Sequence, residues 1–208
     1  MEVYSVKKGK FYFNGDKIQP IFFQYILTFI LIFFSIRLHG WIELIAAIAF
    51  YVYITLFIKK ETKMDSMRVY FLPNCTYQLS TNYDQVNKLF GFSEGYHHWN
   101  SARIGWRCTD GEKIELLAYA YINGQRIIKP MITCRPETWV FCNIQNQPSK
   151  YIFKALDPSG NNITVSIDKP KKISIYSFFK LFIYRLFPYF GGSISAPHDM
   201  KLYLLKLK

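Results

Sequence analysis

The segment "KIELLAYAYINGQRIIKPMIT", residues 113–133, decides the fold class of most of this chain. Apolar and polar side chains alternate on both sides of "NG", which is the pattern of a half-buried β-strand. Asn123 and Gly124 can adopt the positive φ angles of a two-residue hairpin turn. Residues 113–122 and 125–133 are therefore predicted to be neighbouring antiparallel strands.

The same alternation continues on both sides of this hairpin. Turn signals such as "TDGE" and "DPSGNN" separate the segments that show it. These further predicted strands are 67–72, 101–109, 138–144, 150–156, 162–167 and 200–207. Because hairpins join most of them and no βαβ alternation is present, the sequence predicts an antiparallel β-sandwich, with a barrel as the alternative.

One segment near the C-terminus departs from the strand pattern. In "ISIYSFFKLFIYRLFPYF", residues 173–190, the polar side chains recur at close to helical spacing. A helix over about 174–187, ended by Pro188, is therefore predicted. It would either pack across the sheet or lie on a membrane surface with Lys180 and Arg185 near the headgroups.

The N-terminal part of the chain has a different composition. Residues 18–36 are uncharged, residues 41–58 carry one charge, and a four-residue polar turn joins them. Each run is long enough to cross a bilayer, so a transmembrane helical hairpin is predicted over 18–60, preceded by a basic segment over 1–17 and followed by a cytoplasmic β-domain over 61–208. Lysines flank the outer ends of both runs, which predicts a multi-pass protein of the cytoplasmic membrane with both termini inside.

Charge and cysteine usage limit the classes of partner. The chain has a formal net charge of +12, but its basic residues are scattered rather than clustered, so a nucleic acid is not the expected partner. The four cysteines form no CxxC pair, and free buried thiols are expected. The predicted partners are the lipid bilayer and a small molecule or protein, and the hairpin could join copies of the chain into an oligomer. No cofactor is predicted.

Two polar stretches stand out from the strand pattern: "HHWNSARIGWR" at 97–107 and "PYFGGSISAPHDM" at 188–200. Together with "NKLFGFSEG" at 87–95 and "LLAYAYINGQR" at 116–126, they resemble an uncharacterised bacterial β-domain family. The resemblance covers roughly residues 67–208. It implies a concanavalin-like or jelly-roll sandwich and transfers no function.

These stretches supply the candidate ligand-binding residues, namely His97, His98, Asn100, Arg103, Trp106, Arg107, His198 and Asp199. Convergence of the histidines and Asp199 would suit a divalent metal or acid–base chemistry, and whether a metal binds is left open. Arg103 and Arg107 share a face of a regular strand and could grip a phosphate or carboxylate. Trp99 and Trp106 could stack on a ring. The alternative is structural: turn-locking contacts, and pairing of Arg103 with Glu115.

Three functions follow from these features. The first is a membrane-anchored, non-enzymatic β-domain that binds a small ligand or partner. The second is a membrane-perturbing effector, as in some antiphage defence systems, whose β-domain senses an anionic signal such as a cyclic nucleotide; this rests on an analogy of architecture alone. The third is a hydrolase that uses His198 and Asp199, although no catalytic template such as GxSxG or HExxH is present.

Overall fold

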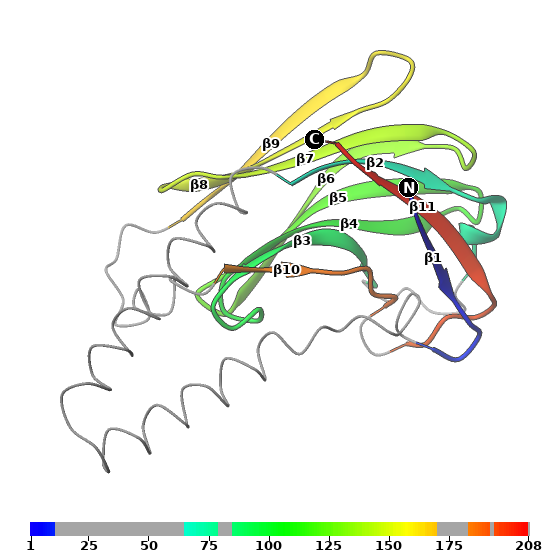
Figure 1. Ribbon diagram of the computed structural model, residues 1–208, viewed down its shortest axis with the longest axis horizontal. Helices are drawn as coiled ribbons and strands as arrows, with labels where there is room; N and C mark the ends of the chain where they lie inside the picture. The colour runs from blue at the N-terminus through cyan, green and yellow to red at the C-terminus, as the bar shows by residue number, and fades with distance from the viewer. Residues whose placement is uncertain (11–64, 79–84, 170–182, 192–193, 208) are drawn as a thin grey trace, which may run out of the picture.

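The computed structural model describes residues 1–10, 65–78, 85–169, 183–191 and 194–207, which form two antiparallel β-sheets packed face to face (Figure 1). The six-stranded sheet A has the order β1 (Glu2–Val6), β11 (Met200–Lys206), β2 (Asp65–Phe71), β7 (Trp139–Asn146), β8 (Lys150–Leu156) and β9 (Asn162–Asp168). The five-stranded sheet B has the order β10 (Ile183–Leu186), β3 (Asn87–Glu94), β4 (Ser101–Thr109), β5 (Lys113–Ile122) and β6 (Gln125–Cys134). A single 3₁₀ turn, η1 (Pro73–Cys75), follows β2 within the described residues.

The β5–β6 hairpin forms as its sequence requires. Asn123 and Gly124 have φ angles of 51° and 81°, and Ile122 pairs with Gln125 on either side of them. This turn has the hand that matches the twist of the two strands, so it fixes their register. The register in turn decides which side chains of β4 and β5 face the core and which face outward.

The core lies between the two sheets and consists of the inward-facing half of each strand. In β4, Ala102, Ile104 and Trp106 are fully buried, and the side chains between them point to the opposite face. The largest fully buried side chains also include Phe71, Phe90, Tyr151, Phe153 and Phe190. Each such side chain contributes about 1.5–3 kcal/mol on burial, so these residues are the main favourable contribution to the packing of the two sheets.

Three strands of the sandwich, β1, β3 and β10, were not predicted. Residues 2–6, which were expected to precede the domain, form β1 and pair with β11, with Val6 fully buried. Residues 87–94 form β3, in which every residue is buried, so its sequence lacks the alternation of a half-buried strand. A bulge between Lys88 and Phe90 further disturbs its period.

The predicted helix over 174–187 is wrong where the structure describes it. Residues Ile183–Leu186 form β10, an edge strand that pairs with β3 from Ile183↔Glu94 to Leu186↔Gly91. Pairing satisfies the backbone groups along the free edge of β3, which a helix could not do. Residues 174–182 lie outside the described part of the chain.

The predicted fold class, a transmembrane hairpin joined to a β-domain with a C-terminal helix, is corrected accordingly. The described residues form two antiparallel sheets without an α-helix, and none of their elements is a helix long and apolar enough to cross a membrane. The membrane assignment and the multi-pass location drawn from it are therefore not supported. The predicted hairpin over 18–60 lies outside the described residues.

Candidate functional site

The predicted constellation of histidines does not come together. His97 and His98 lie in the turn before β4, where the Ser101 hydroxyl donates to the His97 carbonyl. His198 contacts the Asn74 carbonyl near the opposite end of β4, where the Tyr77 amide lies against the Cys108 sulfur. Cys108 lies seven positions after Ser101 along β4, a separation of roughly 23 Å. The described residues also hold no group of three metal-ligating side chains.

His198 and Asp199 make the contacts of a locked turn. His198 Nε2 lies 3.0 Å from the Asn74 carbonyl oxygen. The Asp199 carboxylate accepts from Lys7 Nζ and from the Lys8 amide, both at 2.8 Å. The Lys7 hydrogen bond is the main cause that lowers the pKa of Asp199. These contacts tie the chain after β1 to the start of β11, which favours the structural interpretation of this pair.

Three other predicted residues also have structural surroundings. Trp106 is fully buried against Phe71 and Phe190, so it cannot stack on a ligand. Arg107 Nε donates to Glu115 at 2.6 Å, in place of the predicted Arg103–Glu115 pair. Asn100 accepts a hydrogen bond from the Asn123 amide at 3.1 Å and so fastens the 95–100 loop to the β5–β6 turn.

Arg103 differs from His198, Asp199, Arg107 and Asn100 because no hydrogen bond or ion pair joins its side chain to a described residue. Its register partners are Gly91 on β3 and Tyr119 on β5, which places it on the outer face of sheet B. The Nε atom is shielded from solvent and has no hydrogen-bond partner within the described part of the chain. Burial lowers the pKa of the guanidinium, and its electrostatic surroundings are tyrosines rather than carboxylates: Tyr119, Tyr184, Tyr121 and Tyr189. An arginine remains charged in such a setting.

A second buried cation, Lys88, lies on the same face. It pairs with Gly105, two residues along β4 from Arg103. Its ammonium nitrogen lies 4.9 Å from the centroid of the Tyr119 ring and 5.5 Å from that of Tyr189. Lys88 is 8% exposed, and burial, with help from Arg103 and Arg126, lowers its pKa to about 8. Sequence analysis missed Lys88, although a lysine between apolar residues in "VNKLF" was a usable signal.

Aromatic and imidazole rings border these cations. His98 packs edge-on against Tyr121, with centroids 5.3 Å apart, and Tyr121 pairs with Arg126 across the β5–β6 hairpin. Burial, followed by Arg103 and His98, lowers the pKa of His97 to about 4; burial and the same arginine also lower the pKa of His98. Both imidazoles are therefore neutral at pH 7. We call this surface the Arg103 face and define it by Lys88, Arg103, Tyr119, Tyr121, Arg126 and His98.

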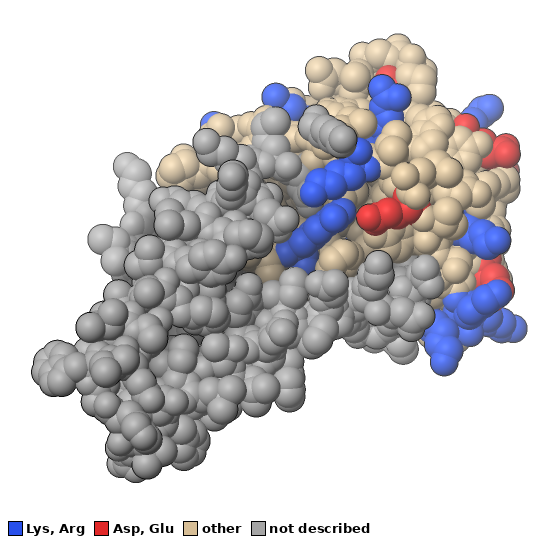
Figure 2. Space-filling view, viewed as in Figure 1, with Lys and Arg blue, Asp and Glu red and all other residues tan. Residues whose placement is uncertain are grey.

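The charge of the Arg103 face has one sign near its centre. Its only described acidic register neighbour along β5 is Glu115, four residues from Tyr119 and already paired with Arg107. Figure 2 shows Lys and Arg side chains spread over the described part of one side of the molecule, with Asp and Glu side chains among them. A low-dielectric surface with several cations, and with no unpaired carboxylate among its described neighbours, attracts anions.

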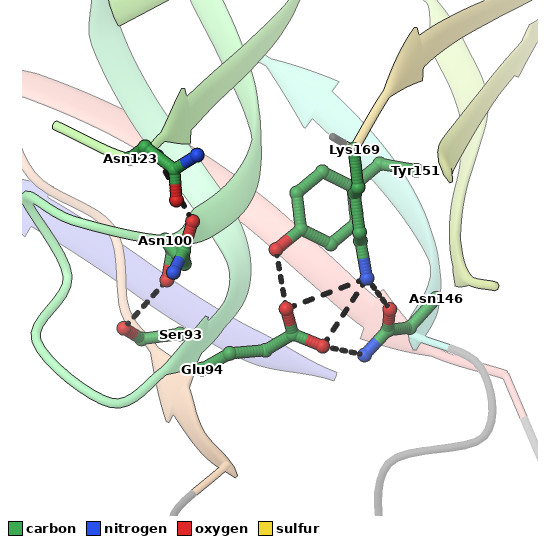
Figure 3. A network of polar contacts seen from close by, with 7 residues as sticks. All are labelled: Ser93, Glu94, Asn100, Asn123, Asn146, Tyr151 and Lys169. Carbon is green, nitrogen blue, oxygen red and sulfur yellow. Dashed lines mark hydrogen bonds and ion pairs between the residues drawn. The ribbon is translucent and has the colours of Figure 1, made fainter. Parts of the chain in front are cut away.

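A second polar cluster joins the two sheets at the end of the sandwich near the 95–100 loop (Figure 3). Glu94 of β3 accepts hydrogen bonds from Tyr151 at 2.7 Å and from Asn146 at 2.6 Å. Lys169 forms an ion pair with Glu94 at 3.2 Å, contacts Asn146, and lies 4.0 Å from the Tyr151 ring centroid. Glu94 and Lys169 are each less than one-tenth exposed, and their charges balance. We call this set the Glu94 cluster. Its polar groups pair with one another and link β3 to sheet A.

Comparison of the chain with protein-family models, curated proteins and solved structures finds no match. The resemblance noted above to a bacterial β-domain family therefore stays a prediction. Interpretation of the site depends on its geometry alone.

Proposed function

We propose that this protein is a non-enzymatic binding module that takes a small anionic ligand on the Arg103 face. One observation carries the proposal: Arg103 is a largely shielded guanidinium without a carboxylate partner among the described residues. Buried charges in folded proteins are as a rule paired, because an unpaired one costs several kcal/mol. A bound anion would supply the missing partner.

The surroundings of Arg103 favour a phosphate or carboxylate attached to a planar ring. A guanidinium binds the oxygens of such an anion with two parallel hydrogen bonds, and tyrosine hydroxyls can donate further ones. The rings of Tyr121 and His98 lie beside the cations and offer a surface on which a flat group can stack. A nucleotide has both a phosphate and a planar ring. In this proposal, the cyclic nucleotide that the sequence suggested as a signal would therefore bind at the Arg103 face.

The test is isothermal titration calorimetry of the full chain with inorganic phosphate, pyrophosphate, AMP and a cyclic dinucleotide. Arg103→Gln should weaken binding of the best of these about 10- to 150-fold, the value of one charge-assisted hydrogen bond. Arg107→Gln is the matched control, because Arg107 lies on the same strand face but is already paired with Glu115. Equal affinity of Arg103→Gln and the parent protein, or no binding of any probe, would refute the proposal.

A further inference from the structure

Lys88 has an arrangement that a simple ion-pairing lysine does not need. Its side-chain nitrogen donates to the carbonyl oxygens of Val86 at 2.5 Å and Gly191 at 3.1 Å. Both acceptors are backbone groups, and no described carboxylate forms an ion pair with this lysine. The rings of Tyr119 and Tyr189 flank the nitrogen.

Two acceptors match the hydrogen count of a neutral amine. A neutral lysine carries two N–H bonds and one lone pair, so the Val86 and Gly191 carbonyls use both hydrogens and leave the lone pair unoccupied. The charged form has three N–H bonds, and among the described residues its third one meets the rings of Tyr119 and Tyr189. Those rings attract a cation and so oppose neutralisation. Burial and the two arginines nonetheless prevail, and the pKa of Lys88 falls to about 8.

We propose that Lys88 is a nucleophilic amine that captures an aldehyde group of the anionic ligand as a Schiff base. This inference rests on the proposed function, because Arg103 would hold the anionic group of the same molecule. The Lys88 nitrogen attacks the aldehyde carbon and forms a C–N bond. The resulting carbinolamine loses its oxygen as water, which takes the two amine hydrogens, and a C=N bond remains. No oxidant or reductant is needed, and hydrolysis reverses the step.

The position of Lys88 favours this reaction in two ways. About one quarter of an amine with a pKa near 8 is neutral at pH 7.5, against about 0.1% of an ordinary lysine, so the reactive form is enriched by roughly 200-fold. Lysines become nucleophilic in this manner when they are desolvated or placed beside another cation. Lys88 also lies diagonally across β3 and β4 from Arg103, which is the separation that a small molecule with an anionic group and an aldehyde can span.

The probe is pyridoxal 5′-phosphate, which carries an aldehyde and a phosphate on one planar ring. The full chain is incubated with it, reduced with borohydride to fix the imine, digested, and mapped by mass spectrometry. Lys88 should be modified at least ten times faster than the strand lysines Lys150 and Lys154. The rate of modification at Lys88 should rise with pH to a midpoint near 8, a measurement that needs no variant. Modification of all three lysines at equal rates would overturn the inference.

Two further arms separate this inference from the proposed function. A deoxypyridoxine phosphate, which lacks the aldehyde, should still bind the parent protein and Lys88→Arg but bind Arg103→Gln more weakly. Pyridoxal, which lacks the phosphate, should modify Lys88 more slowly than its phosphate ester does. Binding of the deoxy compound without selective Lys88 modification overturns only the nucleophile. Selective modification by pyridoxal without any phosphate binding sustains the nucleophile and overturns the anion site.

Discussion

Replacing Arg103 with methionine should make the ligand-free protein more stable. The Nε atom of Arg103 is shielded and has no hydrogen-bond partner among the described residues, so folding removes this N–H group from water without a compensating hydrogen bond from that part of the chain. An unsatisfied buried group of this kind costs about 1–3 kcal/mol. Methionine keeps most of the aliphatic packing beside Tyr119 and removes that cost. We therefore expect the free energy of unfolding to rise by about 1–3 kcal/mol. Each kcal/mol corresponds to a rise of about 2–4 °C in Tm for a chain of this size.

Equilibrium urea unfolding at pH 7 measures this change, with and without added phosphate. The parent protein should be stabilised by phosphate in proportion to its occupancy, and Arg103→Met should not. Arg107→Met is the control: it breaks a partly buried ion pair with Glu115 and should lower stability by about 1 kcal/mol. If Arg103→Met lowers the stability of the phosphate-free protein by more than 1 kcal/mol, the guanidinium has a structural role and the reasoning fails.

Three other changes test separate parts of the fold. Glu94→Gln leaves the Lys169 ammonium buried without its counter-charge, so the free energy of unfolding measured in urea should fall by about 3–5 kcal/mol. An unchanged free energy of unfolding would show that the pair is not buried in solution. In an NMR titration His97 should stay neutral until about pH 4. Because its folded pKa lies below the unfolded value near 6.5, its contribution to stability should be lost as the pH falls from about 6.5 to about 4. Protonation of His97 near pH 6.5 would contradict the burial of its ring. Gly124→Ala places a Cβ atom at a residue with φ +81°, 3.2 Å from the Trp99 ring. It should lower the free energy of unfolding by about 1 kcal/mol or more, and with it Tm. An unchanged Tm would mean that an alanine adopts this turn without strain.

Strands with one exposed face were predictable from sequence alone. Segments 150–156 and 200–207 match β8 and β11, because in each of them a buried side chain alternates with a more exposed one. The "NG" turn was equally predictable, since its φ angles are a local property of Asn123 and Gly124. Local patterns of this kind depend on neighbouring residues, and the sequence contains those.

Segments without alternation were not predictable in the same way. β3 is buried along its whole length, and β10 is a four-residue strand within residues 173–190, whose polar side chains recur at close to helical spacing. What makes residues 183–186 a strand is the unpaired edge of β3, about 90 residues earlier in the chain. An edge that needs hydrogen-bond partners is a tertiary feature, and no local pattern records it.

The candidate site divides along the same line. The sequence by itself identified Arg103 and the polar stretch around it, because charged residues in a strand of apolar neighbours are conspicuous. Only the tertiary structure separated Arg103 from Arg107, by giving Glu115 to the second, and placed Lys88 beside the first. The pairing of strands decides which side chains meet across a sheet, and burial decides which of their charges stay uncompensated. Both depend on contacts between residues far apart in the chain, so the fold alone sets them.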